Sequence, residues 1–465
     1  MKIFLANAPW RKQGFYGVRA GSRWPHFEKD ASQYMPFPFF LAYATSLLLK
    51  NGFTPLLVDA IAEDIDDESF LSRIKSFEPD VIFFETSSIS LNTDITILQK
   101  VRQLTGDTTR IVFGGAHHTL GDSAFLVEHA ELDFAISGEY EFPLLYLMQA
   151  LRDGSPLDSI PALSRRINGD DIHITPRSTV QPNLDDFPWP ARDMLPMERY
   201  NDRPGGIPAP SLQLLASRGC PFGCIFCAWP QLMYGGKSYR TRSPKDVVDE
   251  IEACVKRFGF KSFYFDDDTF NVGKERILSL CHEIKERNLG LPWAVMARAD
   301  QMDRELLVTL KDAGLTALKY GVESGSQDIL KIACKDLNLP KVMETVLITR
   351  ELGIHYHLTF MLGLPGETTE TARQTIDLAL ELDPDSLQLS IATPFPGSRF
   401  HNMLLEKGHL VSTNPDQYDG YHNSVVRTDA LTHEEIIDLR NEAEEIWKNH
   451  CEQRRNLSPK ILIGR

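Results

Sequence analysis

The part of the sequence that decides the fold is residues 218–230, which read Arg-Gly-Cys-Pro-Phe-Gly-Cys-Ile-Phe-Cys-Ala-Trp-Pro. This stretch holds Cys220, Cys224 and Cys227 at a C-x3-C-x2-C spacing. Three thiolates this close together can bind one metal centre and leave a fourth coordination position free. Iron–sulfur clusters are normally held by four cysteine thiolates. A cubane held by three therefore keeps one iron that can bind and activate another molecule.

Three other interpretations of these cysteines are weaker. Gly219, Pro221 and Gly223 predict a loop, and buried core cysteines rarely cluster in loops. Structural zinc sites use four ligands, and no histidine lies within forty residues of the motif. A disulfide framework needs paired cysteines, whereas the remaining four are scattered and are expected to be core residues or incidental thiols: Cys254, Cys281, Cys334 and Cys451.

The motif, with the aromatic Phe226 before its last cysteine, resembles the signature of radical S-adenosylmethionine (SAM) enzymes. The resemblance implies that Cys220, Cys224 and Cys227 bind a [4Fe–4S] cluster whose unique iron chelates the amino and carboxylate groups of SAM. In this family one electron from the cluster cleaves SAM, and the resulting 5′-deoxyadenosyl radical takes a hydrogen atom from the substrate. An external electron donor such as flavodoxin or ferredoxin is the partner that this chemistry implies.

Length and composition exclude several classes of protein. The 465 residues suffice for two or three domains. The 49 Lys and Arg against 64 Asp and Glu give a net charge of −15, which disfavours a phosphate-backbone partner, so we expect no nucleic-acid binding. The most apolar stretch, residues 36–49, contains two prolines and is shorter than the roughly 18 residues of a membrane span. We expect no integral membrane segment, no secretory signal and a reducing, cytoplasmic location.

Residues 1–147 alternate short apolar runs with stretches of helical length, which predicts a parallel sheet covered on both faces, a doubly wound Rossmann-like domain. The predicted strands are 3–7, 54–59, 81–85, 111–114 and 134–137. Ligands of such sheets bind beyond the carboxyl ends of the strands. The small and polar residues at these ends are Asn7, Thr86, Ser87, Ser88, Gly114, Gly115, Ser137, Gly138 and Glu139.

The spacing alone is equally compatible with a domain that binds no ligand. However, a serine-containing turn, then Gly-Gly-x-His-x-Thr, then Ser-Gly-Glu-x-Glu resembles the cobalamin-binding domain that precedes many radical SAM domains. This resemblance implies that the nine residues just named contact cobalamin. The Asp-x-His-x-x-Gly motif that supplies a cobalt ligand in mutases is absent from this domain, and the Asp171-Ile172-His173 match lies outside it and lacks the glycine. His117 and His118 are expected to be loop or hydrogen-bonding residues.

Two further segments connect these parts. The glycine-rich, cationic and aromatic residues 14–25, with Arg19 and Arg23, resemble a segment of radical SAM enzymes including hopanoid-modifying ones, which hints at a lipid or polyol substrate. Residues 148–210 are predicted to be a linker. It contains a hairpin turn at 165–171 and a Pro- and Asp-rich surface crossing at 182–210.

From residue 211 the βα alternation returns, with predicted strands 212–217, 262–266, 294–298, 317–321, 356–361 and 386–392. Six such units predict a (β/α)6 partial barrel over 211–400, followed by a C-terminal helical extension over 401–465. The extension has two helical stretches, of which the second begins at a capping sequence, Thr432–Glu435. A lid over the barrel mouth is the expected role of this extension.

Barrel sites lie at the carboxyl ends of the strands, and the family places its SAM contacts there. The resemblance assigns the SAM amino group to Asp267, with Asp266 and Asp268 as neighbours, and the SAM carboxylate to Arg298, which Asp300 can orient. It assigns the carboxylate or ribose to Glu323 and Ser324, and adenine to the turn that begins at Leu362 and Gly363. Residues 393–398 and Trp229, Tyr234, Tyr320, His355 and His357 are further candidates to reach the cavity.

The sequence therefore predicts a cobalamin-dependent radical SAM enzyme that methylates an unactivated carbon of a small-molecule or lipid substrate, using a [4Fe–4S] cluster, SAM and cobalamin. One alternative is a radical SAM enzyme that carries out cyclisation, rearrangement or carbon–carbon coupling on a lipid, sugar or tetrapyrrole with a degenerate cobalamin domain. An alternative of another class is a non-catalytic corrinoid or metal sensor. Methylthiolation of tRNA fits poorly, because no cysteine precedes Cys220 to hold a second cluster.

Overall fold

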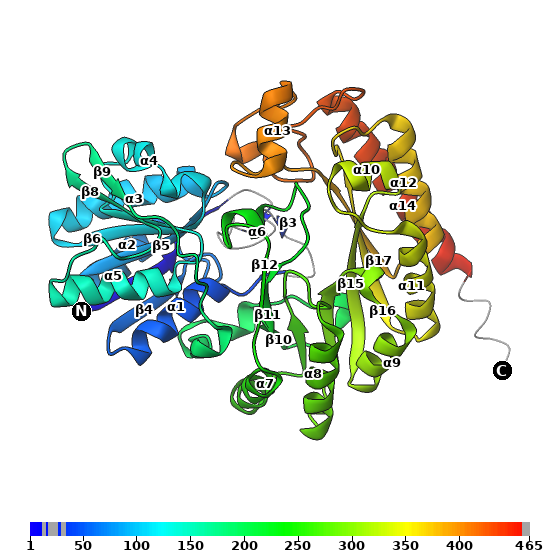
Figure 1. Cartoon of the computed structure of the whole chain (residues 1–465), viewed down its shortest axis with the longest axis horizontal. Coiled ribbons are helices and arrows are strands. Elements are labelled where there is room, and N and C mark those ends of the chain that lie inside the picture. The colour runs from blue at the N-terminus through cyan, green and yellow to red at the C-terminus, as the bar shows by residue number, and fades with distance from the viewer. Residues whose placement is uncertain (12–14, 17–26, 29–33, 458–465) are drawn as a thin grey trace.

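The computed structural model describes residues 1–11, 15–16, 27–28 and 34–457, which form two α/β units side by side (Figure 1). The predicted segment at 14–25, including Arg19 and Arg23, lies outside these residues except for Phe15 and Tyr16. Strand β2 (Phe15–Tyr16) pairs with β3 (Phe27–Glu28).

The first unit is built on a seven-stranded sheet whose strand order is β4-β1-β5-β6-β7-β8-β9. Its parallel part confirms all five predicted strands: β1 (Lys2–Asn7), β4 (Thr54–Asp59), β5 (Val81–Ser87), β6 (Arg110–Ala116) and β7 (Phe134–Ser137). In this order β4, the second strand of this sheet along the chain, lies outside β1, as in flavodoxin-like sheets. Ligands of such sheets bind at the carboxyl ends of the first and third strands, where the direction of winding reverses. Here those strands are β1 and β5.

Helices cover both faces of this sheet, so its strands are apolar throughout. On one face, Ile3 and Leu5 pack with α1 (Phe39–Lys50) and α5 (Glu141–Asp153). On the other face, Phe4 packs with α2 (Asp67–Phe77), α3 (Leu91–Thr105) and α4 (Ser123–Glu128). The doubly wound architecture is therefore confirmed.

The hairpin predicted in the linker extends this first sheet. Strand β8 (Leu163–Asn168) pairs antiparallel with β7, and β9 (Asp171–Ile174) pairs with β8. The chain then crosses to the second unit through short 3-10 turns, of which Pro204–Gly206 lies against β14, β15 and β16. Gly205 is required there, because a Cβ would lie 2.4 Å from that of Ala317 and the backbone φ is +62°. The linker therefore plugs the amino-terminal end of the barrel.

The second unit is a six-stranded parallel sheet in strict chain order, the expected (β/α)6 partial barrel. Its strands are β10 (Ser211–Leu214), β13 (Ser262–Phe265), β14 (Trp293–Ala297), β15 (Leu315–Glu323), β16 (His355–Leu362) and β17 (Ser386–Ile391). The helices along its outer side are α7 (Pro244–Phe258), α8 (Lys274–Glu286), α9 (Arg304–Asp312), α11 (Leu339–Glu351) and α12 (Thr369–Leu382), and α10 (Gln327–Ile332) follows β15 (Figure 1).

The first barrel strand differs from the prediction of 212–217. Strand β10 ends at Leu214, and β11 (Ser217–Cys220) leaves the barrel to pair antiparallel with β12 (Ser238–Thr241). The bend is held by the carboxylate of Asp267, which accepts hydrogen bonds from Ala216 N at 2.8 Å and from the hydroxyl of Ser217. The cysteine-containing loop is thus carried on its own two-stranded ribbon and continues into α6 (Ala228–Leu232).

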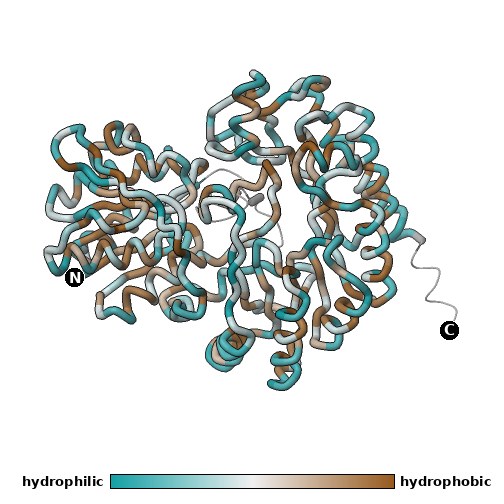
Figure 2. Tube along the Cα trace, viewed as in Figure 1, coloured by the Kyte–Doolittle hydropathy of each residue, from teal (hydrophilic) through white to brown (hydrophobic). Residues whose placement is uncertain are grey.

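The C-terminal extension forms α13 (Arg399–Lys407) and α14 (His433–Leu457). The backbone N of Thr432 donates to Glu435 and the N of Glu435 donates to Thr432, so the predicted capping box is present. Helix α14 packs on α12 and β17 and extends the barrel wall, so a role as a lid stays a prediction only for the segment between α13 and α14. Along each helix, hydrophilic and hydrophobic residues alternate, as the changing colours of Figure 2 show. Within the described part of the chain, no helix is long and apolar enough to cross a membrane.

Close packing between β5 and β6 gives a first testable prediction. Gly115 has φ +128°, and a Cβ there would lie 2.5 Å from the carbonyl oxygen of Thr86. Gly115→Ala should therefore lower the free energy of unfolding of the first unit by ~3 kcal/mol, from strain and overpacking together. Urea unfolding monitored by circular dichroism measures this.

Gly121→Ala is the matched control, since its nearest neighbour would be the Ser137 hydroxyl at an ordinary 3.5 Å. An equal, small effect of both substitutions would contradict the packing argument.

Candidate active site between the two sheets

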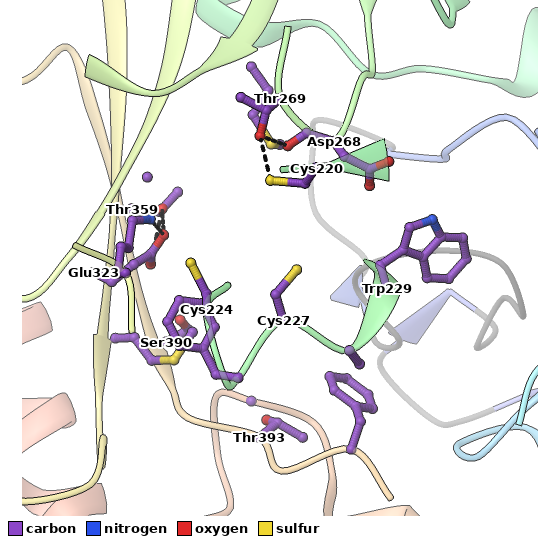
Figure 3. Close-up of a pocket in the computed structure, with 18 of the residues that line it drawn as sticks. Cys220, Cys224, Cys227, Trp229, Asp268, Thr269, Glu323, Thr359, Ser390 and Thr393 are labelled. Atoms are coloured by element: carbon purple, nitrogen blue, oxygen red, sulfur yellow. Dashed lines mark hydrogen bonds and ion pairs between the residues drawn. The ribbon is translucent and has the colours of Figure 1, made fainter. Parts of the chain in front are cut away.

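A cavity of about 260 Å³ lies between the carboxyl ends of the barrel strands and the first unit. Three parts of the chain line it: the ends of β5 and β6, the cysteine loop with α6, and the ends of the barrel strands. In Figure 3 the thiols of Cys220, Cys224 and Cys227 point into the same open space, with Glu323 and Thr359 on one side and Trp229 on the other. The cavity therefore joins both sheets at the edges where ligands of such sheets bind.

Backbone contacts hold the cysteine loop over the barrel mouth. Gly219 N donates to the Asp268 carboxylate at 2.8 Å, and Ile225 N donates to Ala333 O at 3.0 Å. The side-chain amide of Gln231 donates to the carbonyls of Ile225 and Cys227 at 3.1 and 2.7 Å. These bonds satisfy the loop's own backbone groups and leave its three thiols directed at the cavity.

The arrangement of the thiols fits a cluster better than a single ion. Among the described residues, no group of three His, Cys, Asp or Glu side chains is close enough together to hold one metal ion. A cubane is larger than an ion and takes each thiolate at a different iron. Burial raises the pKa of Cys224, and the neighbouring cations Lys335 and Arg298 oppose this effect. The cavity therefore supplies positive charge for the thiolate form of this cysteine.

Two ion pairs at the ends of β14 and β15 form the charged wall of the cavity. Arg298 binds Asp300 through two nitrogens, at 3.1 and 2.9 Å, and lies 3.9 Å above the ring of Phe222. Lys335 Nζ lies 2.8 Å from Glu323 Oε1. A guanidinium, an ammonium and carboxylates on one wall can bind the carboxylate and amino groups of a zwitterion.

Of the residues assigned to SAM, the structure places three in the cavity wall: Phe226, Arg298 and Glu323. Asp267 is fully buried and directed at Ala216 and Ser217, so the structure corrects its selection; its neighbour Asp268 lines the cavity instead. Ser324 is also fully buried, with its hydroxyl 3.3 Å from that of Thr375 and accepting from Ser326 N at 3.1 Å.

Leu362 and Gly363 also lie away from the cavity. Leu362 is fully buried, and a Cβ on Gly363 would touch Val426 and Ile436, so the C-terminal segment covers this turn. Gly363 N donates to the buried carboxylate of Glu367. The turn at the end of β16 is thus held by the protein's own buried carboxylate. Met361 is the residue at this strand end that lines the cavity.

Several lining residues were not singled out from the sequence. Lys335 follows a short helix rather than a strand, and Asp419 and Gly420 belong to the C-terminal extension. Thr359 lies three residues before the end of β16, and Ser390 lies one residue before the end of β17. Counting back by two residues from the predicted strand ends, Met361 and Ala392, would have found both, because alternate residues share a face. Of the aromatic and histidine candidates, Trp229 lines this cavity, whereas Tyr320 is buried against Thr349.

On the side of the first unit, four residues line the cavity: Ser87, Ser88, Ile89 and Ala116. Ser88 and Thr119 occupy both ring nitrogens of His117, with the Ser88 hydroxyl 3.1 Å from Nδ1 and the Thr119 hydroxyl 2.6 Å from Nε2. His117 therefore has no free nitrogen to offer a metal.

Three other residues assigned to cobalamin, Thr86, Gly114 and Gly115, are used inside the protein, whereas Asn7 is not. Thr86 donates to the buried Asp94 at 2.6 Å. Asn7, 1% exposed at the end of β1, has no hydrogen-bond partner for either atom of its side-chain amide among the described residues. A Cβ on Gly114 would clash with the ring of Phe83, and one on Gly115 would clash with the carbonyl oxygen of Thr86. Both glycines therefore allow β5 and β6 to pack closely.

The Ser137-Gly138-Glu139 turn contacts the second unit and does not line the cavity, so its contact with cobalamin stays a prediction. Ser137 accepts from Arg177 at 3.2 Å, and a Cβ on Gly138 would lie 2.7 Å from the carbonyl of Met233. Glu139 binds Arg240 at 2.6 Å and Arg218 at 3.0 Å. This turn therefore docks the first unit onto the ribbon that carries Cys220.

Arg218 is the centre of that docking contact. Only 2% of it is exposed, and it binds Glu139 and also Glu141, at 2.7 Å. Three aromatic rings surround its guanidinium, whose Cζ lies 4.7–4.8 Å from the centroids of Phe40, Tyr43 and Phe187. A buried cation with two carboxylate partners from the other unit ties the cysteine loop to the first sheet.

Comparison with known proteins agrees with this geometry. The model of the radical SAM superfamily matches residues 214–379. The uncharacterized methyltransferase PH0819 of Pyrococcus horikoshii is 30% identical over 406 residues, which cover 87% of this chain and 86% of that protein. The anaerobic magnesium-protoporphyrin IX monomethyl ester cyclase of Rubrivivax gelatinosus is 26% identical over 409 residues, covering 86% of this chain and 72% of the cyclase.

A solved structure shares the fold across both units. It is that of the radical SAM methyltransferase TsrM from Kitasatospora setae with cobalamin and a [4Fe–4S] cluster bound. It superposes with a TM-score of 0.67 at 20% identity and covers 87% of this chain and 75% of TsrM. With the cysteine loop over a partial barrel and a relative this similar over nearly its full length, the chain belongs to the radical SAM superfamily.

The buried Arg218 gives a second prediction. Arg218→Met leaves the buried carboxylates of Glu139 and Glu141 without this partner, which should cost ~3–5 kcal/mol of stability. The midpoint of urea unfolding, followed by tryptophan fluorescence, measures the loss.

Arg257→Met is the control for removal of an arginine. Arg257 pairs with Asp193 at the surface, where the two side chains are 63% and 58% exposed, so the change should cost less than ~1 kcal/mol. Equal losses in the two variants would rule out a special role for Arg218.

A third prediction concerns Asp94, which accepts hydrogen bonds from Thr86 and Ser90 behind the serine turn. Burial raises the pKa of Asp94 to about 7, and these two hydrogen bonds oppose the rise. In the unfolded chain the pKa is about 3.9, so between about pH 4 and 7 only the folded state keeps this proton. The free energy of unfolding of the wild type should therefore fall relative to that of Asp94→Asn as the pH rises, by up to about 1.4 kcal/mol per pH unit.

Above about pH 7 the difference between the two proteins should be constant. Denaturant unfolding at several pH values measures it, with Asp107→Asn, an exposed carboxyl of the same unit, as the control. A difference that does not depend on pH would show that Asp94 is already ionised in the fold.

Proposed function

We propose that this protein is a cobalamin-dependent radical SAM methyltransferase acting on an unactivated carbon of a small-molecule or lipid substrate. The observation that carries the proposal is that the three thiols and the serine turn of the first unit line one cavity. When bound there, a [4Fe–4S] cluster and SAM supply hydrogen abstraction by a carbon radical, and cobalamin supplies methyl transfer. All other parts of the activity depend on how this chain binds, orients and shields these groups.

The proposed cluster ligands are Cys220, Cys224 and Cys227. Arg298 and the Lys335–Glu323 pair would bind the amino-acid end of SAM, with Asp268 replacing Asp267 as the acid near its amino group. Phe226 lies beside these groups on the cysteine loop, with its ring 5.9 Å from Lys335 Nζ. Each charge of the wall already has a partner of opposite charge before SAM binds. These partners hold the charged side chains in place for a charged ligand.

Cobalamin would bind on the opposite wall, against Ser87, Ser88 and Ala116. Ser87 and Ala116 end β5 and β6, and Ser88 follows β5. These residues lie near the point where the winding of the sheet reverses, which is where flavodoxin-like sheets hold their ligands. Ala116 leaves room, and the serine hydroxyls can hydrogen-bond to polar groups of the ligand. Because both nitrogens of His117 are occupied, we do not assign this histidine as a cobalt ligand.

The apolar part of the cavity wall would keep water away from the reacting carbon. It consists of Ile89, Trp229, Leu232, Met361 and Phe395, between the two proposed cofactor sites. Exclusion of water strengthens the electrostatic interactions inside the site and suppresses side reactions.

An electron donor such as flavodoxin or ferredoxin is the proposed protein partner, because the cluster must be reduced from outside. A reducing cytoplasm is the proposed location, since none of the seven cysteines forms a disulfide.

A second candidate function is a radical reaction without methyl transfer, such as a ring closure. The similarity to the Rubrivivax cyclase, which covers 86% of this chain, supports this candidate beside the methyltransferase. Membership of an enzyme superfamily speaks against the sensor alternative.

A fourth prediction tests the proposal. Cys220→Ala, Cys224→Ala and Cys227→Ala should each lose at least about nine-tenths of the iron bound after anaerobic reconstitution, because three ligands are the minimum for this site. Cys451→Ala, on α14, should keep it. Iron content and the visible spectrum measure this, and iron retained in all three variants would contradict the assignment.

The same preparation separates the two candidate functions. Wild-type protein mixed with hydroxocobalamin and desalted should retain corrin bands beside the cluster absorption. If the reconstituted cluster cleaves SAM but no corrin is retained, the methyltransferase proposal is contradicted and the second candidate function is favoured.

A further inference from the structure

On its outer side, the cysteine loop reaches the surface beneath two cations. Pro221 is exposed, and so are Lys237, just before β12, and Arg399, at the start of α13. Arg399 donates to the carbonyl of Gly223 at 3.1 Å and lies 3.6 Å from the sulfur of Cys334. A Cβ on Gly223 would lie 2.7 Å from Lys237 Cε and 2.8 Å from its ammonium. Both cations therefore lie directly on the peptide between Cys220 and Cys224.

These cations stand out electrostatically. The chain carries a net charge of −15, yet neither Lys237 nor Arg399 has an acidic side chain within 4.0 Å among the described residues. Asp336 is exposed on the nearby turn after Cys334 and makes no ion pair with either of them in that part of the chain. An unpaired, exposed positive pair in an acidic protein attracts an acidic partner and speeds its approach.

The location of the pair bears on the proposed function, on which this inference rests. A cluster held by the three cysteines would be enclosed by the barrel on one side and by Ser87, Ser88 and Ala116 of the first unit on another. The loop around Pro221 and Gly223 is the side that the described structure leaves exposed. Electron transfer slows steeply with distance, so a protein donor delivers an electron best by contacting this loop.

We propose that Lys237 and Arg399, with Pro221 and Gly223 between them, form the docking surface for a small, acidic one-electron carrier protein. The carrier gives up one electron and the cluster takes it up, and no bond is formed or broken in this step. The two cations pair with carboxylates of the carrier and place its redox group over the loop. Such peripheral charges act mainly on the rate of association.

The test uses full-length, reconstituted protein and measures the rate of cluster reduction by stopped-flow absorbance. The reductants are flavodoxin hydroquinone, reduced ferredoxin and photoreduced deazariboflavin, a small molecule that needs no docking surface. Lys237→Glu and the double variant Lys237→Glu/Arg399→Glu should be reduced more slowly by a carrier protein, with the double variant at least about tenfold slower at low salt. The difference should vanish near 1 M salt, where the Debye length falls to about 3 Å.

Lys75→Glu is the matched control, because Lys75 is an exposed lysine on α2 of the first unit and carries the same change of charge. It should be reduced at the wild-type rate. All variants should react equally with deazariboflavin, and Lys237→Glu alone tests the surface if loss of the Arg399–Gly223 bond disturbs the loop. The carrier that shows the charge-dependent rate identifies whether a flavin or an iron–sulfur protein docks.

Three results would overturn the inference: unchanged reduction of Lys237→Glu and the double variant by both carriers, an equal loss in Lys75→Glu, or wild-type protein that deazariboflavin reduces and neither carrier does. These results leave the proposed function intact. Failure of the wild type to assemble a cluster would instead refute the proposed function and this inference with it.

Discussion

The buried guanidinium of Arg218 is the interaction on which the rest of the site depends. It lies two residues before Cys220 and binds carboxylates that come from the first unit, Glu139 and Glu141. Burial of charges gives little net stability even when they are paired, so the main consequence of this contact is geometric. It sets the distance between the ribbon that carries the cysteines and the edge of the first sheet, and thereby the size of the cavity.

The same constraint explains why the two walls of the cavity differ. The barrel wall carries the compensated charges of Arg298 and the Lys335–Glu323 pair, whereas the facing wall of the first unit offers small polar and apolar groups. A charged ligand and a large, mostly uncharged ring system can therefore bind face to face. The reacting carbon of a substrate would lie between them, where neither sheet alone could enclose it.

Much of the architecture could be predicted from local patterns. The apolar runs of the first unit are strands because both faces of a parallel sheet are buried, and five predicted strands are confirmed. The cysteine spacing predicted the position of the site and three of its lining residues outright. The ribbon β11–β12 was missed because its stability comes from a long-range contact, Asp267 to Ala216 and Ser217, which no local pattern reveals.

The corrections share a physical cause. Asp266, Asp267 and Asp268 are adjacent acids at a strand end, and successive side chains point to opposite sides, so the register of the strand decides which of them faces the cavity. Likewise, the Ser-Gly-Glu turn has a sequence suited to a ligand, but docking of the second unit uses Glu139 for Arg218 and Arg240.

By itself, then, the sequence determined the two α/β units, the cysteine motif and the superfamily, because these depend on local periodicity and on residues close together in the chain. Only the tertiary structure decided which side chains share the cavity, because that choice depends on the packing of residues far apart in the sequence.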